Sequence, residues 1–489
     1  MGFGQLEQKV NERFRDNFMQ YDASTNLELG RLMPKEWGVS IPMYAGISNA
    51  YSRPEFDPYD FDIRVRDNLE KLVGDERREY LRQVQDFTSI KSLNFTNVRK
   101  NKTGGGKARP WDISNFNLTY AFSETFRSSP IIEYDIIRRH KGGLAYQYNT
   151  RTKYIEPFKK LIGRSKWLEL IKDFNFNPIP NRFSFRTEMN RQYGETVLRD
   201  LYGDALLDTT HNKFWTWDRF YDMRWDITKS LKLDFNAANL ARIDEPDGRI
   251  DTDAERDSIW TNILNLGRNT NYRHTITLNY NLPTSKFPLT DWINARAAYS
   301  ADYEWEAASL VVDSLGNTLR NSRNIRLNAD GNLSRLYNKI DILKRANQRT
   351  RRRSPSPRRR GSENSEEQSK EENSKDDDKG GGGLHPALKT ALQVVTGLKR
   401  ASVNYTRTEG TVLPGYEPET EFMGLRNWTA PGWEFITGYQ PDSFDLNRYA
   451  ANGWIVQAQT LPFQHTQTLQ ENFDMRITVE PLPDMRIDL

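Results

Sequence analysis

Long stretches in which polar and apolar residues strictly alternate constrain the fold of this chain more than any other feature. In the stretch from residue 270 to residue 282, only His274 interrupts the apolar positions. The apolar positions are Tyr272, Ile276, Leu278 and Tyr280, and the polar positions between them include Asn271, Arg273, Thr275 and Asn279. Successive side chains of a β-strand point to opposite faces, so a period of two predicts a strand with one apolar and one polar face.

The same alternation recurs along the chain. Clear segments are 115–126, 181–192, 218–228, 231–241, 270–282, 293–305, 325–334, 400–408 and 472–480, and weaker segments are 23–31, 38–49, 89–99 and 142–151. These runs last about 10 to 13 residues, whereas strands of globular proteins average about 5 to 6 and membrane-crossing strands need about 9 to 11. We therefore predict an all-β fold, a segment of a large antiparallel transmembrane β-barrel, with alternate faces turned to lipid and to an aqueous lumen.

Composition agrees with a folded chain and excludes several classes of site. The chain of 489 residues is 36% hydrophobic and 28% charged, but 12% is aromatic, and disordered chains are poor in aromatic residues. No run approaches the ~18 apolar residues of a membrane-spanning helix. The absence of cysteine excludes disulfides and thiolate metal ligands. The net charge of +4 is too balanced to indicate a nucleic-acid partner.

Connector lengths give a second indication of a barrel, because outer-membrane barrels have short periplasmic turns and long external loops. Short connectors lie at 32–37, 228–230, 283–291 and 481–484, and long connectors lie at 50–88, 193–217, 242–269 and 411–470. Two longer segments on the short side, 152–180 and 335–399, carry helical periodicity and are predicted to be periplasmic insertions.

The predicted organisation has four parts. Residues 1–22 are a helical or loop lead-in, 23–334 are barrel strands with loops, 335–399 are the second insertion, and 400–489 are further strands around the large external loop 411–470. Within the second insertion, residues 347–383 pair an Arg/Ser-Pro block with an acidic block and glycines. Such blocks cannot bury a core, so we predict a disordered linker there.

The alternation also assigns individual residues to the two faces. The residues predicted to line the lumen, and so the path of transported molecules, are Asn271, Arg273, Thr275, Asn279, Arg296, Asp302, Arg326, Asn328 and Asp330. The residues predicted to face lipid are Tyr272, Ile276, Leu278, Tyr280, Tyr299, Leu327 and Leu333.

The sequence offers no convincing catalytic or cofactor site, and we expect a protein that is not an enzyme and needs no cofactor. The stretch 103–107 resembles a phosphate-binding loop but lacks the first glycine and the hydroxyl after the lysine. The acidic stretch with Asp247, Asp251, Asp253 and Asp257 lacks the glycine of a calcium loop, so an ordinary solvated turn is favoured over a calcium site. We expect no metal site, although the sequence leaves calcium at these loop residues open.

Several segments resemble one known family. Residues 91–100 (KSLNFTNVRK), 155–161 (IEPFKKL), 166–195, 269–292 and 400–416 (RASVNYTRTEGTVLPGY) are similar to the SprA (Sov) family, the outer-membrane translocon of the type IX secretion system. The resemblance implies localisation in the outer membrane and export of folded cargo proteins, including adhesins of gliding motility. It also implies accessory partners, namely a lateral-gate binder and a periplasmic plug, and no catalytic residues. Members of this family are several times longer, so the chain is expected to be an internal fragment.

Two alternatives remain open at the level of pattern. A TonB-dependent transporter or a porin would share the strands but would export nothing. A soluble β-sandwich could bind glycans through the aromatic-rich stretch 428–454, although packing within a folded loop is favoured for those residues. The resemblance favours the translocon.

Overall fold

The computed structural model describes residues 15–104, 109–160, 168–200, 207–311, 313–343, 392, 396–457, 461, 464–482 and 485–489. Strands dominate this part of the chain. They are β1 (Asp16–Glu28), β2 (Val39–Ser40), β3 (Pro42–Pro54), β4 (Asp86–Lys100), β5 (Phe116–Ser128), β6 (Ile132–Asn149), β7 (Arg182–Leu198), β8 (Thr210–Trp225), β9 (Leu231–Arg242), β10 (Arg268–Asn281), β11 (Ile293–Glu306), β12 (Asn317–Asn332), β13 (Leu398–Tyr416), β14 (Thr466–Leu482) and β15 (Met485–Asp488).

The described strands form one 15-stranded antiparallel sheet in which neighbours in sequence are neighbours in space. The order runs β1-β3-β4 and then consecutively to β15, while the short β2 pairs with β4. Every segment predicted from alternation overlaps one of these strands, so the prediction of an all-β antiparallel sheet is confirmed. A sandwich needs two sheets packed face to face, and the described residues build a single sheet.

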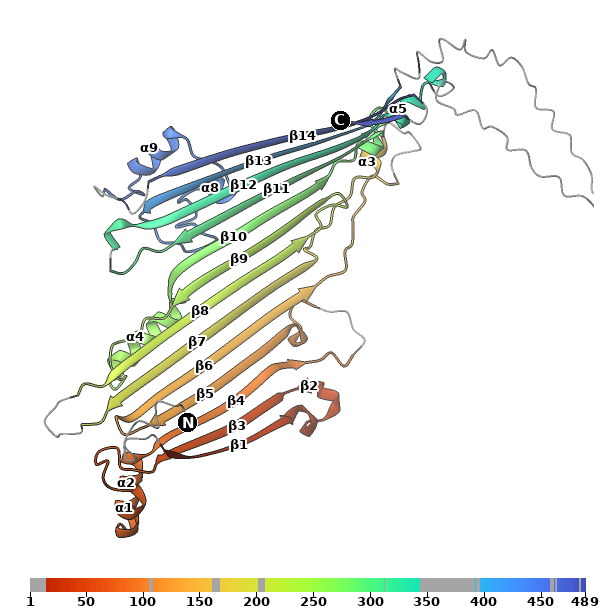
Figure 1. Ribbon diagram of the computed structural model, residues 1–489. Coiled ribbons are helices and arrows are strands. Elements are labelled where there is room, and N and C mark those ends of the chain that lie inside the picture. The colour runs from red at the N-terminus through yellow and green to blue at the C-terminus, as the bar shows by residue number, and fades with distance from the viewer. Residues whose placement is uncertain are drawn as a thin grey trace, which may run out of the picture.

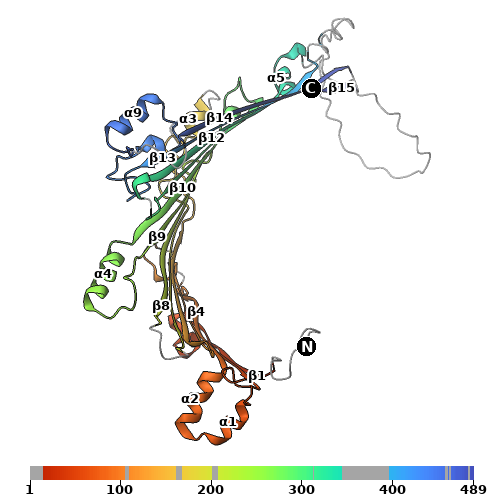
Figure 2. The same cartoon turned by 60° about the vertical axis from the view of Figure 1, so that its left-hand side comes forward.

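The sheet is strongly curved and forms an open arc (Figure 2). β1 lies at one edge and β15 at the other, so the described sheet does not close on itself. The arc therefore has a concave face and a convex face, and helices of the loops lie on the convex side (Figure 2). Among the described residues, no helix is both long and apolar enough to cross a membrane.

The helices are short and lie in the connections, in two groups at opposite ends of the strands (Figure 1). At one end lie α1 (Val65–Lys71), α2 (Gly74–Val84), α4 (Asp253–Leu264), α8 (Trp433–Ile436) and α9 (Ser443–Ala451). At the other end lie α3 (Glu169–Lys172) and α5 (Leu333–Tyr337). Single turns of 3-10 helix occur at Leu29–Leu32, Lys35–Trp37, Ile113–Asn115, Thr284–Lys286 and Asp313–Leu315. We call the first end of the sheet the loop end and the second the turn end.

Several strands are longer than predicted. β1 begins at Asp16, within the predicted lead-in, whose residues 1–14 lie outside the described part. β13 continues to Tyr416 and β14 begins at Thr466, so the predicted loop 411–470 comprises residues 417–465. The part of β13 near the loop end was not predicted because Glu409 and Thr411 lie on its convex face. The alternation expected of a lipid-facing strand has apolar residues at such positions.

Connector lengths differ between the two ends less cleanly than predicted. Residues 129–131 form a tight connection at the loop end, and residues 101–115 form a longer one at the turn end. The first predicted insertion contains α3 and a β-bridge between Ile155 and Phe176. In the second, only its beginning and end and residue 392 are described, so the predicted linker 347–383 lies outside the described residues.

Candidate functional site on the concave face

Strand register places all nine predicted lumen residues on the concave face. Across β10 and β11, Arg273 lies opposite Glu304 and Thr275 opposite Asp302, and Arg296 of β11 lies opposite Asn328 of β12. Residues that face each other across a ladder share one face of the sheet. The nine residues are Asn271, Arg273, Thr275, Asn279, Arg296, Asp302, Arg326, Asn328 and Asp330.

Contacts of α8 and its neighbours identify which face is concave. The loop formed by residues 417–457, which we call the outer loop, touches Tyr303, His274 and Asn321, all on the face opposite to Arg273. α8 and α9 of this loop lie on the convex side of the arc (Figure 2). The face of Arg273 is therefore the concave one, and no helix covers it in this view.

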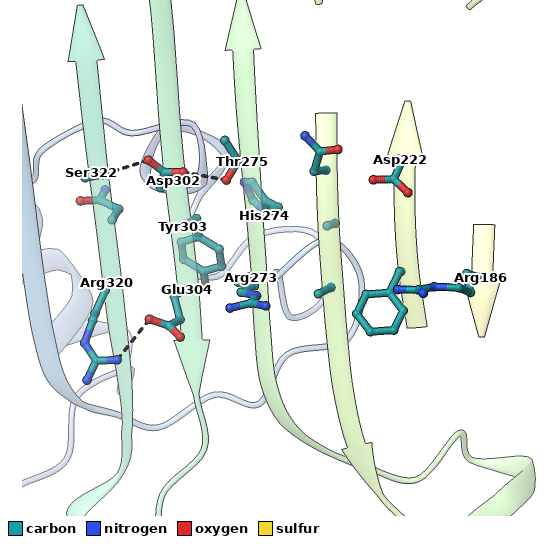
Figure 3. Close-up of a pocket in the computed structure, with 15 residues that line it drawn as sticks. Arg186, Asp222, Arg273, His274, Thr275, Asp302, Tyr303, Glu304, Arg320 and Ser322 are labelled. Atoms are coloured by element: carbon teal, nitrogen blue, oxygen red, sulfur yellow. Dashed lines mark hydrogen bonds and ion pairs between the residues drawn. The ribbon is translucent and has the colours of Figure 1, made fainter. Parts of the chain in front are cut away.

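Cross-strand hydrogen bonds and ion pairs connect the side chains of the concave face near the loop end of β10–β12. Thr275 donates to Asp302 at 2.6 Å, and Ser322 donates to the other oxygen of the same carboxylate at 3.3 Å. Arg320 lies between two glutamates of β11, 3.2 Å from Glu304 and 2.8 Å from Glu306. Figure 3 shows these side chains, except Glu306, projecting from adjacent strands, with the outer loop behind the sheet.

These residues surround a shallow hollow of about 470 Å³ in the concave wall. Small side chains on β9 make the hollow, because Ala238 lies between larger residues on β8 and β10. At its far side, the Arg186 guanidinium lies 4.4 Å from the centre of the Phe220 ring, a cation–π contact. The hollow is lined by side chains of both charges and by hydroxyls and amides, and it opens to the concave side.

The charged side chains near this hollow are largely paired with one another. Its carboxylates near the loop end already accept hydrogen bonds or pair with arginine, so a ligand would have to compete with partners in place. Exposed ion pairs of this kind contribute at most about 1 kcal/mol each and are screened by salt. At this hollow, the charged side chains alone would therefore add little to the binding of a ligand.

The predicted lipid-facing residues lie on the convex face, with two differences. Tyr280 and Leu327 are exposed there, and Ile276, Leu278 and Tyr299 are half-buried. Tyr272 is on the same face but is 4% exposed, because Gly424 and Leu425 of the outer loop pack over it. Leu333 begins α5, because β12 ends at Asn332, and so lies on no strand.

The outer loop packs on the upper convex face through a core that the sequence only hinted at. Phe435 and Trp305 are nearly fully buried, and the Trp305 indole donates to the carbonyl of Pro418 at 3.1 Å. Gly424, with a φ of +84°, lies so close to Tyr303 that a Cβ would overlap the ring. Phe435 and Tyr449 of the aromatic-rich stretch 428–454 belong to this core, as expected from packing within a folded loop, whereas Trp428 and Trp433 are exposed.

Buried polar residues on the convex face lie where the outer loop packs against the sheet. His274, the one interruption of the apolar alternation in β10, lies 2.8 Å by its Nε2 from the carbonyl of Ile436. Asn321 donates to the carbonyls of Phe435 and Tyr439 at 2.9 and 2.7 Å. A buried polar group is costly unless it is hydrogen-bonded, so these residues are explained by loop backbone that packs against them. The interrupted alternation was the signal in the sequence that could have located this contact.

The acidic stretch with Asp251 and Asp253 forms a helix start. Thr252 and Glu255 make a reciprocal capping box at the N-terminus of α4, and the backbone amide of Thr252 holds the pKa of Glu255 below its usual range. Asp253 pairs with Arg256 at 3.1 Å. In the described part of the chain, no three acidic or histidine side chains are grouped so that they could hold a metal ion.

Comparison with known proteins gives one finding. Residues 1–69, which include β1, β3 and the start of α1, match the SprA_N family model, described as motility related/secretion protein. No curated protein matches the chain.

Proposed function

Because this chain is a member of the SprA family of motility-related and secretion proteins, we propose that it forms part of the wall of a protein-conducting channel in the outer membrane. The channel would export folded cargo proteins by the type IX route, including proteins of gliding motility. The family match supports a role in motility or secretion, and the channel is inferred from the two faces of the sheet. The proposal assigns no catalytic step to the chain.

The observation that carries the proposal is the separation of polar and apolar side chains between the two faces of one curved sheet. On β12, Arg326 and Asn328 lie on the concave face, and Ile325 and Leu327 lie on the convex face. A lipid-facing strand needs its apolar side chains outward and its polar ones toward water. The opposite arrangement, with apolar residues inside the arc, would be required of a soluble barrel.

The proposal requires the open edges of the described sheet to be paired, since unpaired backbone groups are not tolerated in lipid. β1 has 13 residues and, within the part of the chain that the structure describes, pairs with β3 alone. In a membrane, this edge and the edge at β14 and β15 must pair with further strands. We propose that those strands complete a wide barrel around the concave face.

We propose that the loop end faces the cell exterior and the turn end faces the periplasm, with segments 152–180 and 335–399 taken as periplasmic insertions at the turn end. Secreted cargo would pass along the concave wall. The lateral-gate binder and the periplasmic plug of the family are proposed as partners, with outer-membrane lipid against the convex face.

Depletion of the protein tests the transport role. We expect the normally secreted proteins to disappear from the medium and to accumulate in the periplasm. Unchanged extracellular protein levels would refute the translocon, and a selective loss of nutrient uptake would favour the TonB-dependent transporter or porin. Fractionation in detergent, with heat-modifiable electrophoretic mobility as the readout, tests the barrel separately from transport.

A further inference from the structure

The turn end of β11–β15 carries a second hollow in the wall, with a volume of about 950 Å³. α5 and β15 border it, near the C-terminal end of the sheet (Figure 1). Its charged lining side chains are four arginines, namely Arg335, Arg400, Arg476 and Arg486, and three aspartates, namely Asp291, Asp330 and Asp488. We call this hollow and the two concave arginines beside it, Arg296 and Arg326, the arginine bowl.

Most of these cations lack an anionic partner within the protein. Among the described residues, no carboxylate lies within 4.0 Å of Arg296, Arg326, Arg400 or Arg476, and none of these guanidinium groups makes a side-chain hydrogen bond. All four are exposed on the concave side. Arg486 differs, because it pairs with Asp488 at 3.0 Å.

Strand register brings two of the unpaired arginines together. Arg400 of β13 lies opposite Thr478 of β14, and Arg476 lies opposite Ser402, so the two arginines are diagonal neighbours. Diagonal side chains on adjacent strands lie about 7 to 8 Å apart, within reach of long side chains. Like charges at this distance repel, and Asp330 on the neighbouring strand does not pair with either of them.

The opposite end of the same strands has the reverse charge. At the loop end of β11 and β12, the concave face carries Asp302, Glu304 and Glu306 against the single cation Arg320. Along β11 and β12, the concave face therefore changes from basic at the turn end to acidic at the loop end. A protein surface of one sign raises the local concentration of oppositely charged partners.

We propose that the arginine bowl binds acidic segments of polypeptides. The chemistry fits because a guanidinium donates two parallel hydrogen bonds to a carboxylate, and several guanidinium groups without internal partners can each bind one. The inference rests on the proposed function, in that the concave face is the transport path and the turn end is its entrance. Lipid headgroups are disfavoured as the occupant because the arginines project from the concave face, away from the apolar convex side.

Binding of a fluorescein-labelled oligoglutamate peptide to the intact protein in detergent, followed by fluorescence anisotropy, tests the proposal. The variant is Arg400→Gln with Arg476→Gln. The matched control is Arg127→Gln with Arg242→Gln, which removes the same charge from the concave face at the loop end. Loss of a charge-assisted contact to each arginine should raise the dissociation constant about tenfold per residue in the first variant. The control should bind as the unmodified protein does.

Equal affinity of the two variants, or equal binding of an oligolysine peptide, would overturn the proposal. Binding of inorganic phosphate or of anionic phospholipid vesicles in place of the peptide would also overturn it. An Arg400→Lys, Arg476→Lys variant should retain part of the affinity, which distinguishes lost charge from misfolding. The assay does not depend on secretion, so failure of peptide binding refutes the bowl alone, whereas intact secretion after depletion refutes the channel alone.

Discussion

Two adjacent residues of β12 allow the assignment of the two faces to be tested directly. Leu327 lies on the convex face and is 45% exposed, between Ala297 and Tyr405 on the neighbouring strands. Asn328 lies on the concave face opposite Arg296. The perturbation is a lysine at each position in turn, so that the same charge is placed on opposite faces one residue apart.

The expected cost at Leu327 follows from its place on the strand. The outer loop reaches down the convex face to Arg323 and to the hydroxyl of Tyr299, which lies opposite Ile325, and β12 ends at Asn332, so Leu327 lies in the convex part that this loop leaves uncovered. A lysine on the lipid face at the bilayer midplane costs about 2 to 4 kcal/mol. At Asn328, only repulsion between the new lysine and Arg296 opposes the change. Such a like-charge cross-strand pair costs at most about 1 kcal/mol.

Urea titration of the intact protein folded into phospholipid vesicles measures both free energies of unfolding. We expect Leu327→Lys to lower the free energy of unfolding by at least about 1 kcal/mol more than Asn328→Lys does, because under the proposed assignment only the first places a charge in lipid. If the sheet were soluble, both positions would be exposed to water and both changes would fall within about 0.5 kcal/mol. Equal effects of the two substitutions would therefore refute the assignment of the convex face to lipid.

Two further predictions concern the connections. Phe435→Ala should destabilise the outer loop by about 3 to 5 kcal/mol, because Phe435 is fully buried against Tyr303 and Tyr449. Limited proteolysis should then cut within residues 417–457 while the heat-modifiable sheet persists. Simultaneous loss of the folded outer loop and of the sheet would contradict a separate core in the loop. Hydrogen bonds from Lys159 and Lys229 lower the pKa of Glu156 to about 2. The stabilisation from these two hydrogen bonds should therefore be present above the ordinary carboxyl pKa and be lost as the pH falls toward 2. Hydrogen exchange of residues 155–160 measures this, and a Glu156→Gln variant should exchange quickly at every pH, whereas an unchanged profile in that variant would exclude Glu156 as the cause.

The strands and the two faces could be predicted from the sequence because both depend on local pattern. Alternation at residues 270–282 is enough to separate Tyr280 from Asn279, whatever the neighbouring strand is. The strand boundaries could be predicted less well, as in β13, where Glu409 and Thr411 break the apolar alternation on a strand that continues to Tyr416. The apolar alternation ends there because the outer loop covers this part of the convex face.

The sequence by itself determined which residues form strands and which side of each strand is polar. Only the tertiary structure decided that the polar faces of the strands lie on the concave side of the sheet. It also decided how far the outer loop covers the convex face and which arginines lie together at the turn end. The physical reason is that alternation acts between neighbouring residues, whereas these properties depend on contacts between residues far apart in the chain. Tyr272 and His274 illustrate the limit: the pattern placed both on the apolar face, but the outer loop, more than 140 residues later in the sequence, buries them.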